Sequence, residues 1–123
     1  MYSFTYHRPG SVMEALECYR SADDGLYMAG GQTLIPTLKQ RLAAPSDLID
    51  LGAIAELTGV DVAPDRVSIG AFTRHATVAA HPDIRRVLPV LADLAAQIGD
   101  AQVRNMGTMG GSVANSDPAA DYP

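Results

Sequence analysis

One cysteine and no tryptophan occur among the 123 residues of this chain. Cys18 therefore cannot form an internal disulfide, and alone it cannot ligate an iron–sulfur cluster. Its neighbours Leu16 and Tyr19 belong to a predicted helix, so we expect a buried structural thiol. The first residues include no apolar run of the kind a secretory leader needs. Together these features predict a cytoplasmic protein.

The chain also lacks an excess of positive charge. Nine Lys and Arg stand against 14 Asp and Glu, which gives a formal net charge of −5. This balance argues against a broad electrostatic surface for nucleic acid or for an anionic membrane. The apolar runs are far shorter than the roughly 20 residues of a membrane span. Because 47% of the residues are hydrophobic and only 19% are charged, we expect a folded domain.

Common signatures of catalytic and nucleotide sites are missing. The glycine pattern fits neither the dinucleotide fingerprint of a Rossmann fold nor the Walker A motif of a P-loop protein. His7, His75 and His81 do not have the spacing of metal ligands. The sequence contains no recognisable Ser-His-Asp or Cys-His arrangement. We therefore expect no metal site and assign no catalytic residue in this chain.

The first part of the chain alternates between strand and helix patterns. Ser11 and Glu14 suit a capping box at the start of one helix, and Leu34, Leu38 and Leu42 are spaced to share one face of the next. This alternation favours a small parallel α/β unit. The predicted strands cover residues 4–6, 26–29 and 47–51, and the predicted helices cover residues 11–22 and 33–42.

After Gly52 the pattern changes. Residues 60–62 and 66–69 alternate with period two around Pro64 and Asp65, which predicts a hairpin. A helix and turn should follow over 75–84, then the longest helix over 87–98 with Pro89 in its first turn. Residues 99–123 have little apolar periodicity and should be irregular. We predict two subdomains, residues 1–55 and residues 56–123.

The first of two glycine clusters, Ala29-Gly30-Gly31-Gln32-Thr33, lies between a predicted strand and a predicted helix. Glycines allow positive φ and close approach of main-chain N–H groups to a ligand, and the start of the helix adds further free N–H groups. The Thr33 hydroxyl could donate as well. The cluster suits a phosphate or diphosphate, but it could also be a tight turn without a ligand.

The second cluster, residues 104–112, combines glycines with hydroxyls at Thr108 and Ser112. Its glycine density is too high for a core strand. It could be an irregular surface loop, or it could present main-chain amides to the same diphosphate from the opposite side. Asp117 precedes Pro118, and we expect it to form an Asx-type turn rather than to contact a ligand.

Taken in order, three segments resemble the FAD-binding (medium) subunit of molybdenum hydroxylases, the family of carbon monoxide and xanthine dehydrogenase flavoproteins. The segments are residues 29–36 (AGGQTLIP), 69–75 (IGAFTRH) and 104–115 (RNMGTMGGSVAN), with DPAAD following at 117–121. The ordered set extends over essentially the whole chain. It implies an α+β FAD-binding fold of the vanillyl-alcohol-oxidase (PCMH) type, with a small α/β subdomain, a second α+β subdomain and FAD between them.

The resemblance also implies which residues bind FAD. One set of residues matches the first pyrophosphate loop of the family, and another set matches its second pyrophosphate loop. Asp121 matches a carboxylate that binds the ribityl chain, and Ile98 matches a residue near the flavin nucleotide. Thr33 replaces a commoner Ser and Met109 a commoner Ile or Leu. The two loop sets are Met28, Ala29, Gly30, Gly31, Gln32, Thr33 and Leu34, and Thr108, Met109, Gly110, Gly111 and Ser112.

By the same resemblance the chain is expected to be an electron-transfer oxidoreductase subunit. It would accept electrons from [2Fe–2S] clusters of a small partner subunit, in a complex whose large subunit carries molybdopterin, and pass them to NAD⁺, a quinone or oxygen. Family members are more than twice as long, so we expect an N-terminal portion, with its second subdomain truncated and inactive alone. The alternatives are a nucleotide-binding regulatory module and a cofactor-free assembly fragment.

Overall fold

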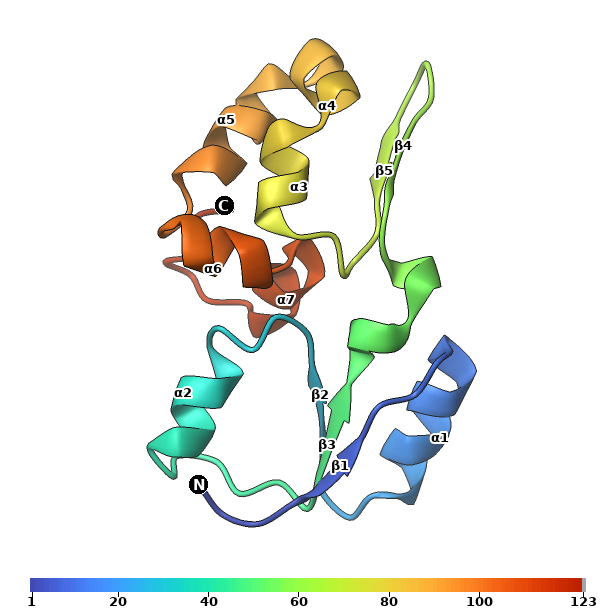
Figure 1. The fold of residues 1–123 in the computed structure, drawn as a ribbon, viewed down its shortest axis with the longest axis vertical. Coiled ribbons are helices and arrows are strands. Elements are labelled where there is room, and N and C mark those ends of the chain that lie inside the picture. Colours follow the sequence, from blue (N-terminus) through green and yellow to red (C-terminus); the bar gives the residue numbers. More distant parts are fainter. Residues whose placement is uncertain (123) are drawn as a thin grey trace. The chain divides into compact units, whose positions relative to one another are not determined.

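The computed structural model of this chain describes residues 1–122. The chain divides into two compact units, Met1–Glu56 and Leu57–Pro123, which are described in turn (Figure 1). The identification of these units with the two subdomains of a FAD site remains a prediction. No helix within residues 1–122 is both long and apolar enough to cross a membrane.

The first unit is built on a three-stranded parallel sheet. Its strands are β1 (Thr5–His7), β2 (Gly25–Met28) and β3 (Asp47–Asp50), in the order β1-β3-β2. Both outer strands pair with β3 in parallel, so Leu48 lies opposite Tyr6 on one side and Leu26 on the other. Leu48 and Ile49 of this central strand are buried. The predicted parallel α/β unit is confirmed.

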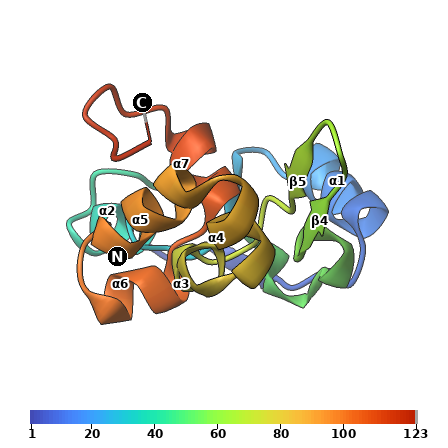
Figure 2. The same cartoon turned by 90° about the horizontal axis from the view of Figure 1, so that it is seen from above.

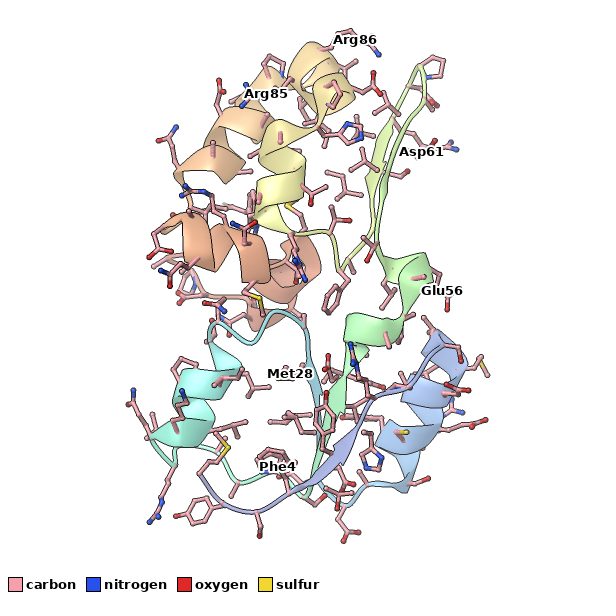
Figure 3. All side chains as sticks on the ribbon, viewed as in Figure 1. Phe4, Met28, Glu56, Asp61, Arg85 and Arg86 are labelled. Atoms are coloured by element: carbon pink, nitrogen blue, oxygen red, sulfur yellow. The ribbon has the colours of Figure 1, made fainter. Side chains whose placement is uncertain are left out.

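Helix α1 (Val12–Ser21) begins at the predicted cap. The Ser11 hydroxyl accepts a hydrogen bond from Glu14 N–H at 3.2 Å, while the Glu14 carboxylate accepts from Gly10 N–H at 2.7 Å, one residue before the cap. Glu56 accepts from Val12 N–H at 3.1 Å and so ties the end of the unit to the start of this helix (Figure 3). Cys18 is half-buried rather than fully buried.

Helix α2 (Leu34–Lys39) is shorter than predicted. Pro36 lies in its first turn, as expected, but the helix ends before Leu42, whose side chain is exposed. The cause is Arg41, which adopts a left-handed φ of 60°. Arg41 N–H donates to Leu38 O and Leu42 N–H to Thr37 O, the pairing of a Schellman motif that stops a helix. Two short 3-10 helices, Leu51–Ala53 and Ala55–Leu57, follow β3.

The second unit begins with the predicted hairpin, β4 (Val60–Val62) and β5 (Val67–Ile69), which pair antiparallel. The helices α3 (His75–Ala80), α4 (Pro82–Val87) and α5 (Pro89–Gln97) follow, and α3 packs on both α4 and α5 (Figure 2). Pro89 opens α5 as predicted. Because α5 has nine residues and α1 has ten, the expectation that this region forms the longest helix was wrong. The core residues are Val78, Ala79, Ile84, Ala92 and Ala95.

Two further helices occupy a region that we expected to be irregular. Helix α6 (Ala101–Met106) starts at Asp100, whose carboxylate accepts from Val103 N–H. Helix α7 (Met109–Asn115) starts at Thr108, whose hydroxyl accepts from Gly111 N–H. Side-chain caps therefore stabilise these short helices despite their weak apolar pattern. Beyond α7, Asp117 accepts from Ala119 N–H at 2.9 Å and makes the predicted Asx turn.

Candidate functional site

The first glycine segment, residues 28–34, follows β2 at the carboxyl end of the parallel sheet. Met28 ends the strand and pairs with Asp50 of β3 (Figure 3). Gly31 has a left-handed φ of 70°, and a Cβ at this position would lie 2.6 Å from Cδ1 of Ile35. The carboxyl ends of parallel strands are where ligands bind in open α/β sheets. The turn therefore requires glycine at position 31 and lies at an edge suited to a ligand.

The hydrogen-bonding groups of this segment are unevenly used. Within residues 1–122, the main-chain N–H groups of Gly31, Gln32 and Thr33 make no hydrogen bond to another protein group. Two of the carbonyls of these residues do accept: Gly31 O from Ile35 N–H at 2.9 Å and Thr33 O from Thr37 N–H at 3.2 Å. The segment also carries no charged side chain. Available donors, occupied acceptors and no negative charge are the properties that an anion-binding turn needs.

The second glycine segment, residues 107–112, differs from our expectation. It is the turn before α7 and the first part of that helix, and the amides of residues 109–112 are already hydrogen-bonded within the protein. Thr108 is buried with 1% exposure. The donors and acceptors are Met109 N–H to Thr73 O (3.0 Å), Gly110 N–H to Ala71 O (2.8 Å), Gly111 N–H to the Thr108 hydroxyl (3.1 Å) and Ser112 N–H to Thr108 O (3.1 Å).

It follows that the amides of residues 109–112 are not free to grip a diphosphate, as the sequence had suggested. These N–H groups hold the start of α7 against residues 71–73 or complete its cap. A ligand contact from this segment would instead come from a side chain. The Ser112 hydroxyl is the candidate because Ser112 is half-buried rather than buried.

The middle segment of the resemblance, residues 69–75, is brought against the second glycine segment. Arg74 and Thr108 form an antiparallel bridge, and His75 N–H donates to Gly107 O at 3.0 Å. A Cβ on Gly110 would lie 2.6 Å from the carbonyl oxygen of Ala71, so only glycine allows this approach. This pairing was not predicted from the sequence, because neither segment contains a pattern that identifies the other as its partner.

Ile98 and Asp121 occupy different environments within the second unit. The Ile98 side chain is buried with 6% exposure, and its carbonyl accepts from Nη1 of Arg104 at 3.0 Å. Asp121 is exposed and lines a hollow of about 370 Å³. The carboxylate of Asp121 is therefore free to accept hydrogen bonds from a ligand hydroxyl.

A histidine and a tyrosine lie beside these residues. Nδ1 of His75 is 3.0 Å from the Tyr122 hydroxyl, and His75 is 5% exposed. Burial lowers the pKa of His75, whereas burial raises the pKa of Tyr122 to about 12. Both side chains are therefore uncharged at neutral pH. The pair was not singled out from the sequence.

The structure assigns the predicted cofactor residues to both units. Residues 28–34 belong to Met1–Glu56, whereas Ile98, residues 108–112 and Asp121 belong to Leu57–Pro123. The prediction that both glycine segments contact one diphosphate stays a prediction. Within residues 1–122, no group of three or more His, Cys, Asp or Glu side chains is placed to hold a metal ion.

Comparison with known proteins identifies the family. A family model described as the FAD binding domain in molybdopterin dehydrogenase matches residues 2–123. The chain belongs to this family. FAD is thus the cofactor of this domain, as predicted, and the available amides of residues 31–33, in a segment without acidic side chains, fit its diphosphate.

Two curated relatives of this FAD-binding domain are medium chains of named dehydrogenases. The chain is 41% identical over 120 residues to the glyceraldehyde dehydrogenase medium chain of Sulfolobus acidocaldarius, covering 98% of this chain and 43% of that protein. It is also 41% identical to the carbon monoxide dehydrogenase medium chain of Hydrogenophaga pseudoflava, covering 98% of this chain and 42% of that one. The chain spans about two fifths of the length of the curated relatives it matches.

Solved structures resemble the domain as well. A crystal structure of Cu,Mo-CO dehydrogenase matches with a TM-score of 0.92 and 37% identity, covering 98% of this chain and 43% of that one. Quinoline 2-oxidoreductase from Pseudomonas putida 86 matches with a TM-score of 0.90 and 35% identity, covering 94% of this chain and 40% of that one. The predicted α+β fold of the vanillyl-alcohol-oxidase (PCMH) type is confirmed.

Proposed function

We propose that this chain is the FAD-binding part of an electron-transfer subunit of a molybdenum-containing hydroxylase or dehydrogenase. The observation that carries the proposal is the first glycine segment, in which the amides of Gly31, Gln32 and Thr33 are available and the carbonyls of Gly31 and Thr33 are not. Such a turn binds an anion through main-chain dipoles without requiring a lysine. The relatives named as medium chains of dehydrogenases support the electron-transfer role.

In this proposal the residues of the chain bind and orient the cofactor. The amides of residues 31–33 bind the diphosphate, and the exposed Thr33 side chain offers a further donor. The Asp121 carboxylate accepts hydrogen bonds from the ribityl hydroxyls. The bound flavin supplies the redox chemistry, so no acid, base or nucleophile is assigned to the chain. In the second glycine segment the Ser112 hydroxyl is the proposed hydrogen-bonding group, and the other residues are proposed to pack against the cofactor. The proposed contacts are Met28, Ala29, Gly30, Gly31, Gln32, Thr33, Leu34, Ile98, Thr108, Met109, Gly110, Gly111, Ser112 and Asp121.

The proposed partners are an iron–sulfur small subunit and a molybdenum-cofactor large subunit. The chain has one cysteine, whereas a [2Fe–2S] cluster takes four thiolate ligands, so clusters that supply electrons would lie on another chain. Relatives include subunits named for nicotine and caffeine hydroxylation or dehydrogenation, which is consistent with a substrate chosen elsewhere in the complex. The low cysteine content also supports a cytoplasmic location.

The test is to purify the full-length protein with added FAD and record its visible spectrum before and after anaerobic dithionite. We expect a stoichiometric flavin spectrum that bleaches on reduction and returns when an acceptor is added. A protein that binds adenine nucleotides but no flavin would instead indicate a regulatory module. Partner subunits that co-purify without flavin, even after FAD is added, would indicate an assembly role.

A further inference from the structure

His75 contacts two segments of the second unit that are far apart in the sequence. Its main-chain N–H donates to Gly107 O at 3.0 Å, at the turn that leads into α7. Its ring lies against the same glycine, since a Cβ on Gly107 would be 2.9 Å from Cδ2 and 3.0 Å from Nε2 of His75. Its Nδ1 is 3.0 Å from the hydroxyl of Tyr122. One residue at the start of α3 thus meets both the second glycine segment and the segment that carries Asp121.

The contact with Tyr122 is more than a surface hydrogen bond. The two rings lie 5.4 Å apart at their centroids with planes tilted by 43°, and the Tyr122 ring packs against the core residues of the unit. Tyr122 is also the immediate neighbour of Asp121, which is exposed. A ring anchored in the core and hydrogen-bonded at its tip restricts the backbone of the adjacent residue. The orientation of the Asp121 carboxylate therefore depends on this anchor.

The residue types suit a fixed, uncharged link. A phenylalanine at position 75 could fill similar space but would leave the hydroxyl of the half-buried Tyr122 without this partner, and the loss of a hydrogen bond there costs free energy. Any residue other than glycine at position 107 would collide with the imidazole ring. The glycine before Thr108 and the histidine that opens α3 are therefore matched to one another, directly before the residue that caps α7.

We infer that His75 is a positioning residue of the proposed FAD site: its ring, held against Gly107 and bonded to Tyr122, fixes the start of α7 and the Asp121 carboxylate relative to one another. The inference rests on the proposed function, because Asp121 and Ser112 are among the residues proposed to contact FAD. It adds three residues outside the proposed FAD contacts, His75, Gly107 and Tyr122, and assigns them the task of holding Asp121 and Ser112 in place.

The experiment compares four variants of the full-length flavoprotein: Tyr122→Phe, His75→Phe, the double variant, and His75→Asn, whose amide can still bond the tyrosine hydroxyl. Tyr2→Phe, at a tyrosine with 50% exposure, is the matched control. Each is titrated with FAD and with ADP, which lacks the ribityl chain. Hydrogen exchange of residues 117–122 is followed in parallel.

Loss of the hydrogen bond between His75 and Tyr122 should weaken FAD binding about 2- to 12-fold, the range that corresponds to one hydrogen bond of about 0.5–1.5 kcal/mol. ADP binding should change less, because ADP cannot use Asp121. Tyr122→Phe and His75→Phe should raise exchange in residues 117–122, and the double variant should add little to either. His75→Asn should restore most of the FAD affinity, which general loss of packing would not allow.

Two other outcomes would overturn the inference, and they are distinguishable. If the wild-type protein binds FAD and all variants bind it equally, with unchanged exchange, then His75 does not position the site and the proposed function stands. If the wild-type protein binds no FAD, the proposed function fails and the inference fails with it, whatever the exchange of residues 117–122 shows.

Discussion

Gly110 and Ala71 approach so closely that no side chain fits between them. The Gly110 N–H donates to the Ala71 carbonyl oxygen at 2.8 Å, and a Cβ on Gly110 would lie 2.6 Å from that same oxygen. This contact joins the segment after β5 to the first turn of α7. From the sequence, Gly110 could belong to an irregular surface loop or to a diphosphate-binding segment; in the structure, packing within the second unit requires glycine at this position.

The first prediction concerns Gly110→Ala. Replacing glycine by alanine in a helix ordinarily stabilises it by about 0.5–1 kcal/mol. At position 110 we expect the opposite sign, a loss of about 1–3 kcal/mol, because the new methyl group collides with main-chain atoms of Ala71 that cannot move away without disturbing the unit. Urea unfolding of both proteins measures the difference.

Gly10→Ala is the matched control for this variant. A Cβ on Gly10 would meet only Oε2 of Glu14, at 3.6 Å, an ordinary van der Waals contact. Its free energy of unfolding should change much less than that of Gly110→Ala. Equal stability of Gly110→Ala and the wild-type protein would mean that the approach of residues 71 and 110 is not a constraint on the fold.

The second prediction concerns Gly31→Val in the first glycine segment. Its left-handed φ of 70° strains any residue with a β-branched side chain, and the added atoms would meet Ile35. We expect FAD affinity to fall about tenfold or more, since about 1.4 kcal/mol of distortion already corresponds to a factor of ten. The far-ultraviolet circular dichroism should stay near that of the wild-type protein.

Gly59→Val provides the comparison for Gly31→Val. Gly59 also has a positive φ, 137°, but a Cβ there would have no atom within 4 Å, and it lies outside the proposed cofactor residues. Strain alone should lower the stability of both variants, and only the change at position 31 should weaken FAD binding. A similar loss of FAD affinity in both would attribute the effect to general destabilisation.

Local patterns predicted the elements whose signals are contained within a few residues. Ser11 and Glu14 marked the start of α1, and the period-two alternation around Pro64 marked the β4–β5 hairpin. The end of α2 could not be predicted, because it depends on Arg41 taking a left-handed conformation that is usual for glycine or asparagine. Helix α6 was missed although Asp100 is a recognisable cap residue.

The chemistry of the two glycine segments was predicted unevenly for a related reason. At residues 31–33 the glycine pattern indicated available amides, and they are available. At residues 109–112 the amides are not available, because the carbonyls of Thr73 and Ala71 accept hydrogen bonds from two of them. These partners lie more than 30 residues away in the sequence and come from a different element, so spacing within the glycine cluster could not reveal them.

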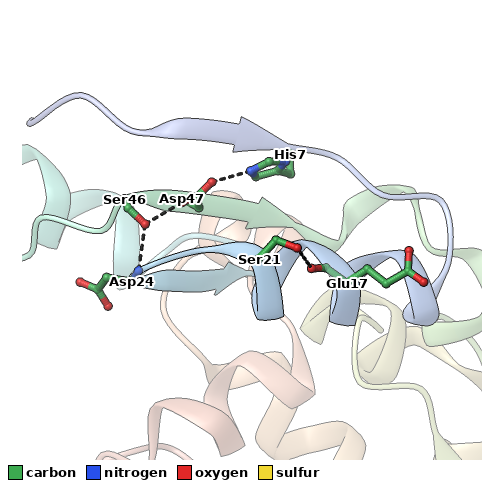
Figure 4. A network of polar contacts seen from close by, with 6 residues as sticks. All are labelled: His7, Glu17, Ser21, Asp24, Ser46 and Asp47. Atoms are coloured by element: carbon green, nitrogen blue, oxygen red, sulfur yellow. Dashed lines mark hydrogen bonds and ion pairs between the residues drawn. The ribbon is translucent and has the colours of Figure 1, made fainter.

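The third prediction concerns acid stability and the polar network beside the sheet (Figure 4). Asp47 accepts from the Ser46 hydroxyl at 2.6 Å and lies 2.7 Å from Nε2 of His7. Hydrogen bonds from Ser46 and then His7 lower the pKa of Asp47 below its ordinary 3.8. As the pH falls, the Asp47 carboxylate is therefore protonated in the unfolded chain before it is protonated in the folded protein. The stability that ionised Asp47 gives the folded state is present above about pH 3.8 and is lost as the pH falls below that value.

Asp47→Asn should accordingly be less stable than the wild-type protein at pH 6, and the difference should shrink as the pH falls below 3.8. Urea unfolding at pH 6, 4 and 3 would measure it. Asp23→Asn, at an exposed carboxylate in the same unit, should differ little from the wild-type protein at each pH. If the difference in free energy of unfolding between Asp47→Asn and the wild-type protein stays constant from pH 6 to pH 3, the lowered pKa of Asp47 is contradicted.

The fourth prediction concerns alkaline titration. Burial, and then the charge of Asp121, raise the pKa of Tyr122 to about 12. The folded state therefore keeps this proton above the tyrosine's ordinary pKa of 10.0, and the resulting stability is lost as the pH rises from 10 toward 12. Absorbance at 295 nm should show one late-titrating tyrosine, which Tyr122→Phe removes. A wild-type titration complete by pH 11 would show that the hydroxyl is not buried.

The account depends most on the diphosphate being what the first glycine segment recognises. Calorimetric titration of the full-length protein with FAD and with riboflavin, which has the same isoalloxazine ring but no phosphate, tests this directly. We predict that FAD binds with high affinity and that ADP competes with it. Riboflavin should bind at least about a hundredfold more weakly, because it cannot form several charge-assisted hydrogen bonds of about 1.5–3 kcal/mol each. Equal affinities for riboflavin and FAD, with no competition by ADP, would contradict the account.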